Sequence, residues 1–338
     1  LAVTVSLREP NHYGGDGYAG PSNSGAESSK THRQSIRGST KDLHNSSAIR
    51  LDPSDESQKN SQMALRSKHI PNRGDNAYWG DLTTNSFASI NPESTVAVLP
   101  VAAVEQHGPH LPLNTDAEIC QGLIRRIVKN NSERLRVIAL PLIRIGESSE
   151  HQDFPGTLGF TAEQLISLWT TLGKQVCRAG IRKLLILNTH GGQPGIVDIV
   201  AQRLRAENGM LVVGVSSFCL GIPDGLFDRQ EIECGIHAGE IETSMMLYLK
   251  PDKVQMNQTE HFKLTSPIMQ KKYKHLALNG MARIAWQAQD LNPQGAVGKA
   301  SKADPERGRI LVRHMVDKIL EVLDDMACFP VETISNGS

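Results

Sequence analysis

From residue 95 onward, short runs rich in valine, isoleucine and leucine alternate with longer segments in which apolar residues recur at helical spacing. Strands that are apolar throughout are typical of a parallel sheet buried on both faces, and the intervening helices provide the covering layers. The alternation therefore predicts an α/β fold, a three-layer sandwich with a mainly parallel central sheet covered by helices on both faces. The expected strands are 95–100, 136–141, 183–188 and 211–217, and the expected helices are about 117–130, 162–180, 194–207, 240–249 and 305–326.

The first 76 residues differ in composition from the rest of the chain. Ser, Asn, Gly, Arg and Asp dominate them, apolar residues are few, and no helical or strand period is present. Such a segment cannot bury enough apolar surface to offset about 1–2 kcal/mol of backbone ordering entropy per residue. We expect residues 1–76 to be a disordered, low-complexity extension and residues 77–330 to form the folded domain. The first methionine is Met63, and we hypothesise that residues 1–62 are extraneous to the functional chain.

The overall composition argues against several classes of partner. Of 338 residues, 36 are basic and 36 are acidic, so no net charge steers the chain toward nucleic acid or an anionic membrane. No run approaches 18 apolar residues, so no transmembrane helix is expected, and no GxGxxG or Walker-type loop supports a nucleotide cofactor. Five scattered cysteines without a Cys-x-x-Cys pair, four of them in apolar surroundings, indicate buried thiols of a cytoplasmic protein. A small-molecule substrate is the expected partner.

The segment 105–116 carries the densest chemistry in the chain, because it places Glu105, His107, His110 and Asp116 in one Pro- and Gly-rich stretch. It follows an expected strand, and α/β enzymes build their sites at such strand ends. Glu105 and His107 are two residues apart, so in extended backbone their side chains leave on the same face. Carboxylate oxygens beside imidazole nitrogens suit zinc, manganese or iron rather than a metal that prefers thiolates. The alternative interpretation is a polar loop with solvated histidines.

Two further segments add residues of the same kinds. The expected strand 183–188 breaks at an Asn-Thr-His-Gly-Gly turn that contains His190, and paired glycines there let the backbone approach a ligand closely. Alone, this turn is a weak signal, because a glycine turn with an incidental histidine has the same sequence. In the third segment, His237 precedes an expected helix that has Glu240 and Glu242 in its first turn. Carboxylates in that position also favour the helix dipole without any function.

Together the three segments resemble the creatininase (creatinine amidohydrolase) family of metal-dependent amidohydrolases. The family pattern Glu-x-His-Gly-x-His-Leu-Pro with a following Asp matches 100–116, the Asn-x-His-Gly-Gly turn matches 188–192, and the His-Ala-Gly-x-x-Glu-Thr-Ser block matches 237–244. The resemblance extends over roughly residues 77–328. It implies a creatininase-like fold and a homo-oligomer, hexamers being common in the family. Weaker family-like segments occur in the same order, at 79–83, 146–157, 295–298 and 306–308.

The resemblance implies a binuclear metal site. Family positions that match Glu105, His107, Asp116 and His190 bind metal, and the aspartate bridges two divalent ions, here expected to be zinc, manganese or iron. Creatininase itself has a further glutamate ligand at the position of Gly192, which has no side chain to offer. We therefore expect the second metal site to be weaker or differently built, and creatinine to be a less suitable substrate.

The implied reaction is hydrolysis of a C–N amide bond, in a small cyclic amide or an N-formyl or amide substrate, by a metal-activated hydroxide. His237 is the expected group that orients the substrate or protonates the leaving nitrogen, since a histidine pKa lies near working pH. Glu242 is expected to complete the metal shell as the substitute ligand, or to act as the base that moves the water proton. Glu240 is a second candidate for that base, and His110 is expected to support the loop or the ligands.

Four residues are candidates for contacts with the substrate. Backbone N–H groups of Gly191 and Gly192 would stabilise the oxyanion, a contribution of about 3–4 kcal/mol per donor. Glu150 and His151 either face the substrate or have a structural role. The loops 144–160 and 218–237, which would surround the pocket, do not indicate a particular ligand.

Other activities known in the family keep alternatives open. They are the hydrolysis or isomerisation of a cyclic sugar-like ketone and the trimming of a peptide, and a substrate profile would separate them. A metal-stabilised, non-catalytic binding protein is a further alternative, but the intact set of ligand types argues against it.

Overall fold

The structure is a computed structural model of the 338-residue chain, and it describes residues 77–130, 134–265, 273, 275–278 and 282–333. The predictions for residues 1–76 fall outside the described residues. Within the described part, buried apolar side chains occur from Ala77 to Val331.

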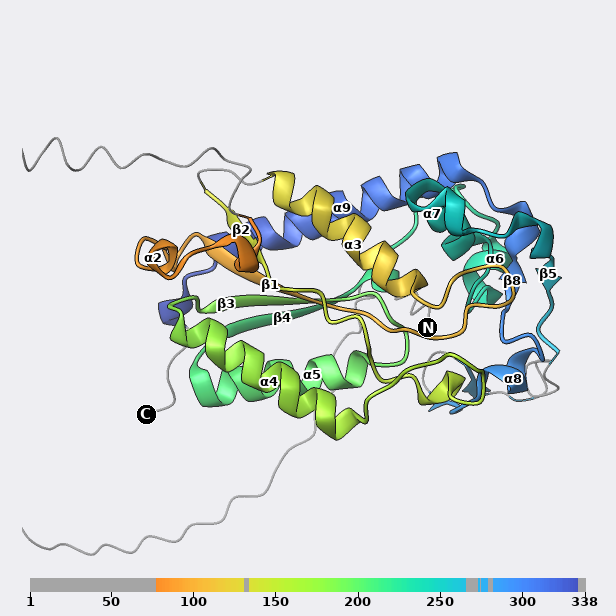
Figure 1. The fold of residues 1–338 in the computed structure, drawn as a ribbon, viewed down its shortest axis with the longest axis horizontal. Coiled ribbons are helices and arrows are strands. Elements are labelled where there is room, and N and C mark those ends of the chain that lie inside the picture. Colours follow the sequence, from red (N-terminus) through yellow and green to blue (C-terminus); the bar gives the residue numbers. More distant parts are fainter. Residues whose placement is uncertain (1–76, 131–133, 266–272, 274, 279–281, 334–338) are drawn as a thin grey trace, which may run out of the picture. The chain divides into compact units, whose positions relative to one another are not determined.

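A parallel sheet of four strands, in the order β2-β1-β3-β4, forms the middle layer (Figure 1). In the pairing register, Val101 lies beside Asn188, and Asn188 lies beside Ser216. The carboxyl ends of three neighbouring strands therefore meet at one edge of the sheet, and the predicted parallel sheet is confirmed. The strands are β1 (Thr95–Val101), β2 (Arg136–Ala139), β3 (Lys183–Asn188) and β4 (Leu211–Ser216).

Helices cover both faces of this sheet (Figure 1). Successive residues of a strand point to opposite faces: Val96 and Val98 belong to one core cluster, whereas Ala97 and Leu99 belong to another. The predicted three-layer sandwich is thereby confirmed. The first cluster includes residues of α3 (Thr115–Ile127), α7 (Glu240–Leu249) and α9 (Pro305–Cys328), and the second includes residues of α4 (Ala162–Arg178) and α5 (Pro194–Asn208).

Each helical layer contains a close approach that a glycine permits. In α4, a Cβ added at Gly173 would overlap the side chain of Leu204 in α5, so the missing side chain lets the two helices pack together. In α9, a Cβ at Gly308 would overlap the backbone oxygen of Ser244 in α7. The second approach holds α7, which carries two carboxylates in its first turn, against the start of α9.

Most element boundaries differ by one to three residues from the sequence-based expectation, while β3 and α7 have the predicted bounds. β1 runs one residue past Pro100, because the Pro100 carbonyl still accepts a hydrogen bond from the N–H of Ile143 at 3.0 Å. The strand predicted over 136–141 ends at Ala139, two residues before Pro141, which has no N–H to donate.

The remaining described elements are short, and Figure 1 shows several of them gathered with α7 at one end of the sheet. β5 pairs with β8, and β6 pairs with β7. These elements are α2 (Thr84–Phe87), α6 (Arg229–Cys234), α8 (Ala288–Leu291), β5 (His261–Phe262), β6 (Leu276–Ala277), β7 (Ala282–Arg283) and β8 (Gly298–Lys299).

The expectation that four cysteines are buried was wrong. Cys120 is buried and Cys177 is half-buried, but Cys219, Cys234 and Cys328 are exposed. Each of these three is the last residue of a short or long helix, where one side of the chain faces solvent. No helix in the described ranges is long and apolar enough to cross a membrane.

Candidate active site

A pocket lies at the carboxyl ends of β1 and β3, where the loop 105–116 and the turn 189–192 meet the segments 146–157 and 237–242. Its polar side chains are those of Glu105, Asp116, Glu150, His151, Thr189, His190, Ser217, His237 and Glu242, and the backbone of Gly191, Gly221, Gly235 and Gly239 also lines it. Its apolar lining consists of Ile119, Phe218, Ile222, Ile236, Ile241, Met245, Trp286, Leu311 and Met315. Of the predicted site residues, His107 and Gly192 are not part of the lining but contact residues that are. The structure therefore brings the main catalytic, metal-binding and substrate-binding candidates together, whereas Glu240 and His110 lie outside the lining.

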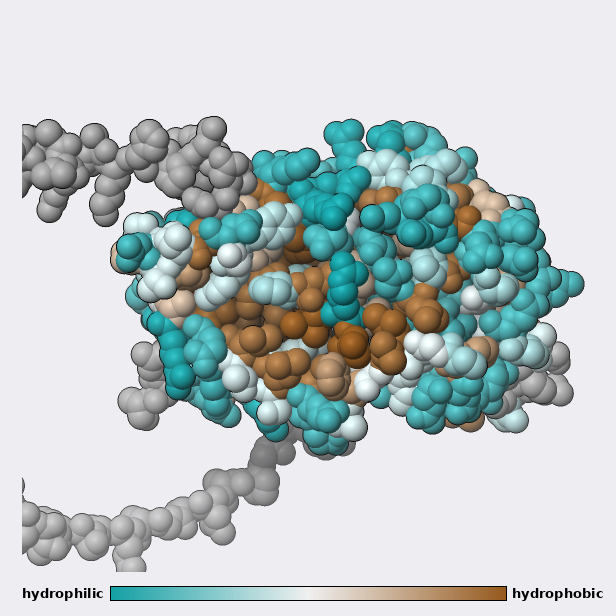
Figure 2. Space-filling model, viewed as in Figure 1, coloured by the Kyte–Doolittle hydropathy of each residue, from teal (hydrophilic) through white to brown (hydrophobic). Residues whose placement is uncertain are grey.

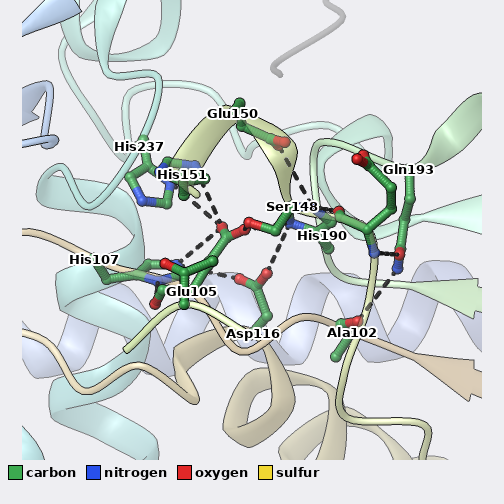
Figure 3. Close-up of polar contacts among 12 residues, drawn as sticks. Ala102, Glu105, His107, Asp116, Ser148, Glu150, His151, His190, Gln193 and His237 are labelled. Carbon is green, nitrogen blue, oxygen red and sulfur yellow. Dashed lines mark hydrogen bonds and ion pairs between the residues drawn. The ribbon is translucent and has the colours of Figure 1, made fainter. Parts of the chain in front are cut away.

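Asp116 is the centre of a buried cluster (Figure 3). It lies in the first turn of α3 and is 2% exposed. Its Oδ1 is 3.3 Å from Nε2 of His107, and its Oδ2 is 3.1 Å from Nδ1 of His190. Oε2 of Glu105 is 3.2 Å from the same nitrogen of His190. The two oxygens of Asp116 thus face two different imidazoles, an arrangement compatible with the predicted bridging role.

Hydrogen bonds on the far side of each ring indicate which nitrogen carries the proton. Nδ1 of His107 is 3.1 Å from the backbone oxygen of Glu105, and Nε2 of His190 is 2.7 Å from the backbone oxygen of Glu147. A carbonyl oxygen only accepts, so in each neutral imidazole the proton lies on that nitrogen. The other nitrogen then presents a lone pair to carboxylates, and Nε2 of His107 has no hydrogen-bond partner among the described residues. Lone pairs that face buried carboxylates need a cation between them, which fits a divalent metal.

The pKa shifts within the cluster favour an ionised carboxylate at Glu105 and protonated imidazoles at His107 and His190, so the site attracts positive charge. Burial raises the pKa of Glu105, but the imidazoles of His190 and His151 lower it well below its usual range. Burial lowers the pKa of His107, yet the Asp116 carboxylate, 3.3 Å from its Nε2, raises it to about 9. Burial likewise lowers the pKa of His190, and Glu105 and Asp116 raise it well above its usual value. In the absence of metal, protons would take the place of the cations.

The carboxylate of Glu150 occupies the space next to Gly192. A Cβ added at Gly192 would overlap Oε1 of Glu150, although the backbone at Gly192 is not left-handed and would itself admit a side chain. Oε1 of Glu150 is 3.5 Å from Nε2 of His190. Ligand atoms of Glu105, Glu150 and His190 lie within 4.8 Å of one another, close enough to share one ion. Burial raises the pKa of Glu150 to about 7.

On the His107 side, His237 and Glu242 extend the cluster. Ligand atoms of these three residues also lie within 4.8 Å of one another. Oε2 of Glu242 accepts a hydrogen bond from the N–H of Ala238 at 2.5 Å, and burial raises the pKa of Glu242. Ala238 has a φ of 54°, which is strained for a residue with a side chain. Strain of this kind persists where the surroundings enforce it, as they do at functional sites.

Sequence reasoning missed two polar residues that hold this cluster in place. Ser148 donates a hydrogen bond to Oε2 of Glu105 at 2.6 Å. Gln106 is 5% exposed; its side-chain amide contacts His151, and its backbone oxygen is 2.7 Å from Nε2 of His237. The position of Gln106 between Glu105 and His107 in the first motif could have indicated that it belongs to the site. Ser148 and Glu105 are far apart in the sequence, so no local sequence pattern predicts their hydrogen bond.

Two other candidates lie outside the pocket lining. Glu240, the second candidate for the base, is buried in an ion pair with Arg307 and is not positioned for that role. Glu240 and Glu242 are two residues apart on a helix, so they leave it on different sides. Nε2 of His110 is 2.9 Å from Oγ1 of Thr243, so His110 braces the 105–116 loop against α7, as expected of a supporting residue.

The three-layer fold and its buried cluster of carboxylates and imidazoles define a metal-binding α/β enzyme. A family model described as creatininase, creatinine amidohydrolase, matches residues 80–323. The chain belongs to the creatininase family, as its motifs indicate, and it is a hydrolase of the class that acts on C–N bonds.

Individual relatives agree with this assignment. The chain is 30% identical over 249 residues to the mycofactocin precursor peptide peptidase of Mycobacterium tuberculosis, covering 70% of this chain and 87% of that protein. It is 28% identical over 206 residues to the creatinine amidohydrolase of Pseudomonas putida, covering 56% and 78%. The fold matches a mutant creatininase with a TM-score of 0.60 at 23% identity, covering 74% of this chain and 98% of that one. Similar proteins also include a 2-amino-5-formylamino-6-ribosylaminopyrimidin-4(3H)-one 5'-monophosphate deformylase of Methanococcus maripaludis, which is 24% identical over 66% of this chain and 87% of that protein.

Proposed function

We propose that this protein is a metal-dependent amidohydrolase that cleaves the C–N bond of a neutral amide or formamide carrying an apolar group. The observation that carries the proposal is the pair of imidazole lone pairs aimed at the two oxygens of Asp116, beside a pocket with a largely apolar wall. Such a set of ligands suits divalent metals, and an apolar wall suits a substrate group that leaves water on binding.

The residues present fit two divalent ions, which we propose to be zinc, manganese or iron. Glu105, Asp116 and His190 would hold one ion, and His107, Asp116 and Glu242 would hold the other. When bound, such ions lower the pKa of a water molecule toward neutrality and polarise the substrate carbonyl. Solved creatininases include a manganese form and a zinc–zinc form, which supports this choice.

In this proposal Glu150 supplies the carboxylate that Gly192 lacks. Creatininase has a glutamate ligand at the Gly192 position, and here the carboxylate of Glu150 fills the adjoining space, within reach of an ion held by His190. The sequence pointed to Glu242 as the substitute ligand and to Glu150 as a substrate contact. We assign Glu150 to the His190 side of the cluster and Glu242 to the other side.

His237 and Glu242 are the proposed catalytic residues. Nε2–H of His237 donates to the backbone oxygen of Gln106, so its Nδ1 presents a lone pair, 3.9 Å from Oε1 of Glu105. A nitrogen that presents a lone pair has no proton to give to the leaving nitrogen. His237 is therefore better suited to orient the substrate or to bind a metal ion. If His237 rather than Glu242 completes the metal shell, Glu242 is the group that would take the proton of the attacking water and return it to the leaving nitrogen. Gly191 lines the pocket and keeps its proposed backbone contact with the substrate.

The lining narrows the substrate class. No lysine or arginine occurs among the described residues that line the pocket, so a phosphate group would find no cationic side chain there. This disfavours a monophosphate such as the one in the name of the deformylase relative. Peptide trimming is the second candidate function, because apolar side chains such as Ile222 and Met315 would suit an apolar peptide residue and a peptidase is among the relatives.

The test is a substrate panel for the full-length protein loaded with zinc or manganese. The probes are N-formylleucinamide, acetyl-leucyl-leucinamide, creatinine and a phosphate-bearing formamide, each with bound metal quantified by elemental analysis. We expect chelator-sensitive hydrolysis of N-formylleucinamide and little turnover of the last two probes. Hydrolysis of the peptide probe alone would select peptide trimming. Two bound ions with no hydrolysis of any probe would contradict the proposed function and favour a metal-stabilised binding protein.

We also propose that the protein is a homo-oligomer, with a hexamer as the expected form. Figure 2 shows hydrophobic residues concentrated in the middle of one face, with polar residues around them. A contiguous hydrophobic patch on a surface marks an interaction site. By their accessibility, the exposed large apolar side chains of the described residues include Leu158, Phe160 and Leu168. Light scattering should give a multiple of the 37.0 kDa chain mass, whereas a monomer would refute this proposal. The cytoplasmic location stays a prediction.

A further inference from the structure

The side-chain amide of Gln106 has only one consistent orientation. Its Oε1 accepts a hydrogen bond from the backbone N–H of Gly108 at 2.8 Å, and its Nε2 donates to the backbone oxygen of Gly295 at 2.7 Å. A flipped amide would set oxygen against oxygen and N–H against N–H. Nε2 is also 2.7 Å from Nδ1 of His151. Because the amide nitrogen can only donate, Nδ1 of His151 must be the acceptor.

This hydrogen bond decides the tautomer of His151. A neutral imidazole that accepts at Nδ1 carries its proton on Nε2. Nε2 of His151 is 3.7 Å from Oε1 of Glu105, and the residue lines the pocket. The ring is 1% exposed and packs against His237 and Trp286, with ring centroids 4.2 Å and 6.3 Å away. The N–H is therefore held in place beside the metal cluster.

The surroundings of Gln106 are built to keep its amide where it is. Gly295 has a φ of 72°, and a Cβ there would lie 2.5 Å from both polar atoms of the amide. The backbone oxygen of Gln106 meanwhile accepts from Nε2–H of His237. Gln106 thus contacts different nitrogens of two neighbouring imidazoles, so that they present different groups to the pocket. His151 offers an N–H, and His237 offers a lone pair.

We propose that Gln106 is a positioning residue that holds His151 as its neutral Nε2–H tautomer, and that this N–H donates a hydrogen bond to the substrate carbonyl oxygen as it becomes an oxyanion. A neutral imidazole with its proton on Nε2 cannot bind a metal through that nitrogen and is a poor acid. It is, however, a suitable preorganised hydrogen-bond donor to developing negative charge. The donor role rests on the proposed hydrolase function, whereas the tautomer does not.

The tautomer is tested by nitrogen NMR of the full-length, zinc-loaded protein labelled with ¹⁵N-histidine. The His151 signals are assigned by their loss in His151→Gln. We expect a proton on Nε2 and none on Nδ1 in the unmodified protein, and a mixture of tautomers in Gln106→Met, which keeps the side-chain length but has no amide. A proton on Nδ1 of His151 in the unmodified protein, or an unchanged His151 tautomer in Gln106→Met, would overturn the proposal.

The donor role is tested by two substitutions of His151, with N-formylleucinamide as substrate. His151→Phe keeps a ring but removes the donor, and it should lower kcat by about 10²–10³-fold, with zinc content and KM close to those of the unmodified protein. His151→Gln can place an amide N–H near the same point but cannot titrate, so kcat should stay within about tenfold of the unmodified value.

If His151→Gln is as slow as His151→Phe, or if either variant loses zinc, the donor role is wrong. If the unmodified protein hydrolyses no probe of the panel, the hydrolase function and the donor role fail together. The NMR result would still decide whether Gln106 sets the tautomer.

Discussion

The two helical layers lie against the same sheet but bury different kinds of side chain. The buried residues of α4 and α5 are all uncharged, and their packing includes the close approach of Leu204 to Gly173. In the opposite layer, α3 buries Asp116 and α7 buries Glu240. One layer therefore behaves as an apolar scaffold. The other carries buried charges that are stable only with a partner, namely an arginine for Glu240 and, as we propose, metal for Asp116.

The largest effect should come from neutralising the charge at the centre of the site. Asp116→Asn should lower metal-dependent turnover by at least about 10³-fold, because several kcal/mol of charge stabilisation are lost with the metals. Circular dichroism should show the fold retained, and elemental analysis should show fewer bound ions. The matched control is Asp198→Asn on the exposed side of α5, which should change neither quantity. A fully active Asp116→Asn protein would rule out the bridged site.

The same truncation made in both layers separates scaffold from site. Leu204 in α5 and Leu311 in α9 are both fully buried, but only Leu311 lines the pocket. Each change to alanine should lower the free energy of unfolding by about 2–5 kcal/mol, through lost burial and the cavity left behind. Only Leu311→Ala should also raise KM for N-formylleucinamide. Urea unfolding and steady-state kinetics measure the two effects, and equal changes in KM would contradict the division of roles.

The buried cluster around Asp116 should make the metal-free protein sensitive to pH. The pKa of His107 is raised from its usual value of 6.5 to about 9 in the folded protein, so the stability that its protonation provides is complete below pH 6.5. That stability is lost as the pH rises through 9, by about 3 kcal/mol for such a shift. Glu150, whose pKa is raised to about 7 by burial, shifts stability in the same direction in this window.

Urea unfolding of the metal-free protein at pH 6.5 and 9.5 measures this loss, and His107→Gln should reduce the difference between the two values. Metal-loaded protein should behave in the opposite way, because metal binds deprotonated imidazole and its affinity rises with pH. Equal stability of the metal-free protein at both pH values would mean that the cluster does not hold protons when metal is absent.

Local pattern, rather than the layer in which a residue lies, decided what could be predicted from the sequence. The bounds of β3 and α7, and the gathering of Glu105, Asp116 and His190, depend on local pattern and on the rule that parallel strands deliver loops to one edge. The partners of individual side chains do not depend on local pattern. Arg307, for example, binds Glu240 in an ion pair and so excludes it as the catalytic base. The two residues are far apart in the sequence, and only packing brings them together.

The smallest and sharpest test concerns Glu150 and Gly192, a pair that lies outside both helical layers. Glu150→Gln keeps the shape of the side chain but removes its charge, so affinity for one of the two ions should fall by at least about tenfold. Competition with a chelator measures this affinity independently of activity. Glu147→Gln on the same segment is the matched control, because the Glu147 side chain contacts Ser149 whereas its backbone oxygen contacts His190.

Moving the carboxylate from position 150 to position 192 tests the same metal-ligand assignment from the opposite side. Gly192→Glu alone should lower metal content, because a side chain at 192 overlaps both Glu150 and the ring of His190. Combined with Glu150→Ala, only the close contact with Nε2 of His190 at 2.5 Å remains, so a small shift of that ring should let the glutamate recreate the ligand position of creatininase and restore the second ion. If the double variant binds no more metal than Glu150→Ala alone, the two positions are not interchangeable. If Glu150→Gln also leaves metal affinity unchanged, Glu150 belongs to the substrate side, and the metal shell consists of Glu105, His107, Asp116, His190 and Glu242.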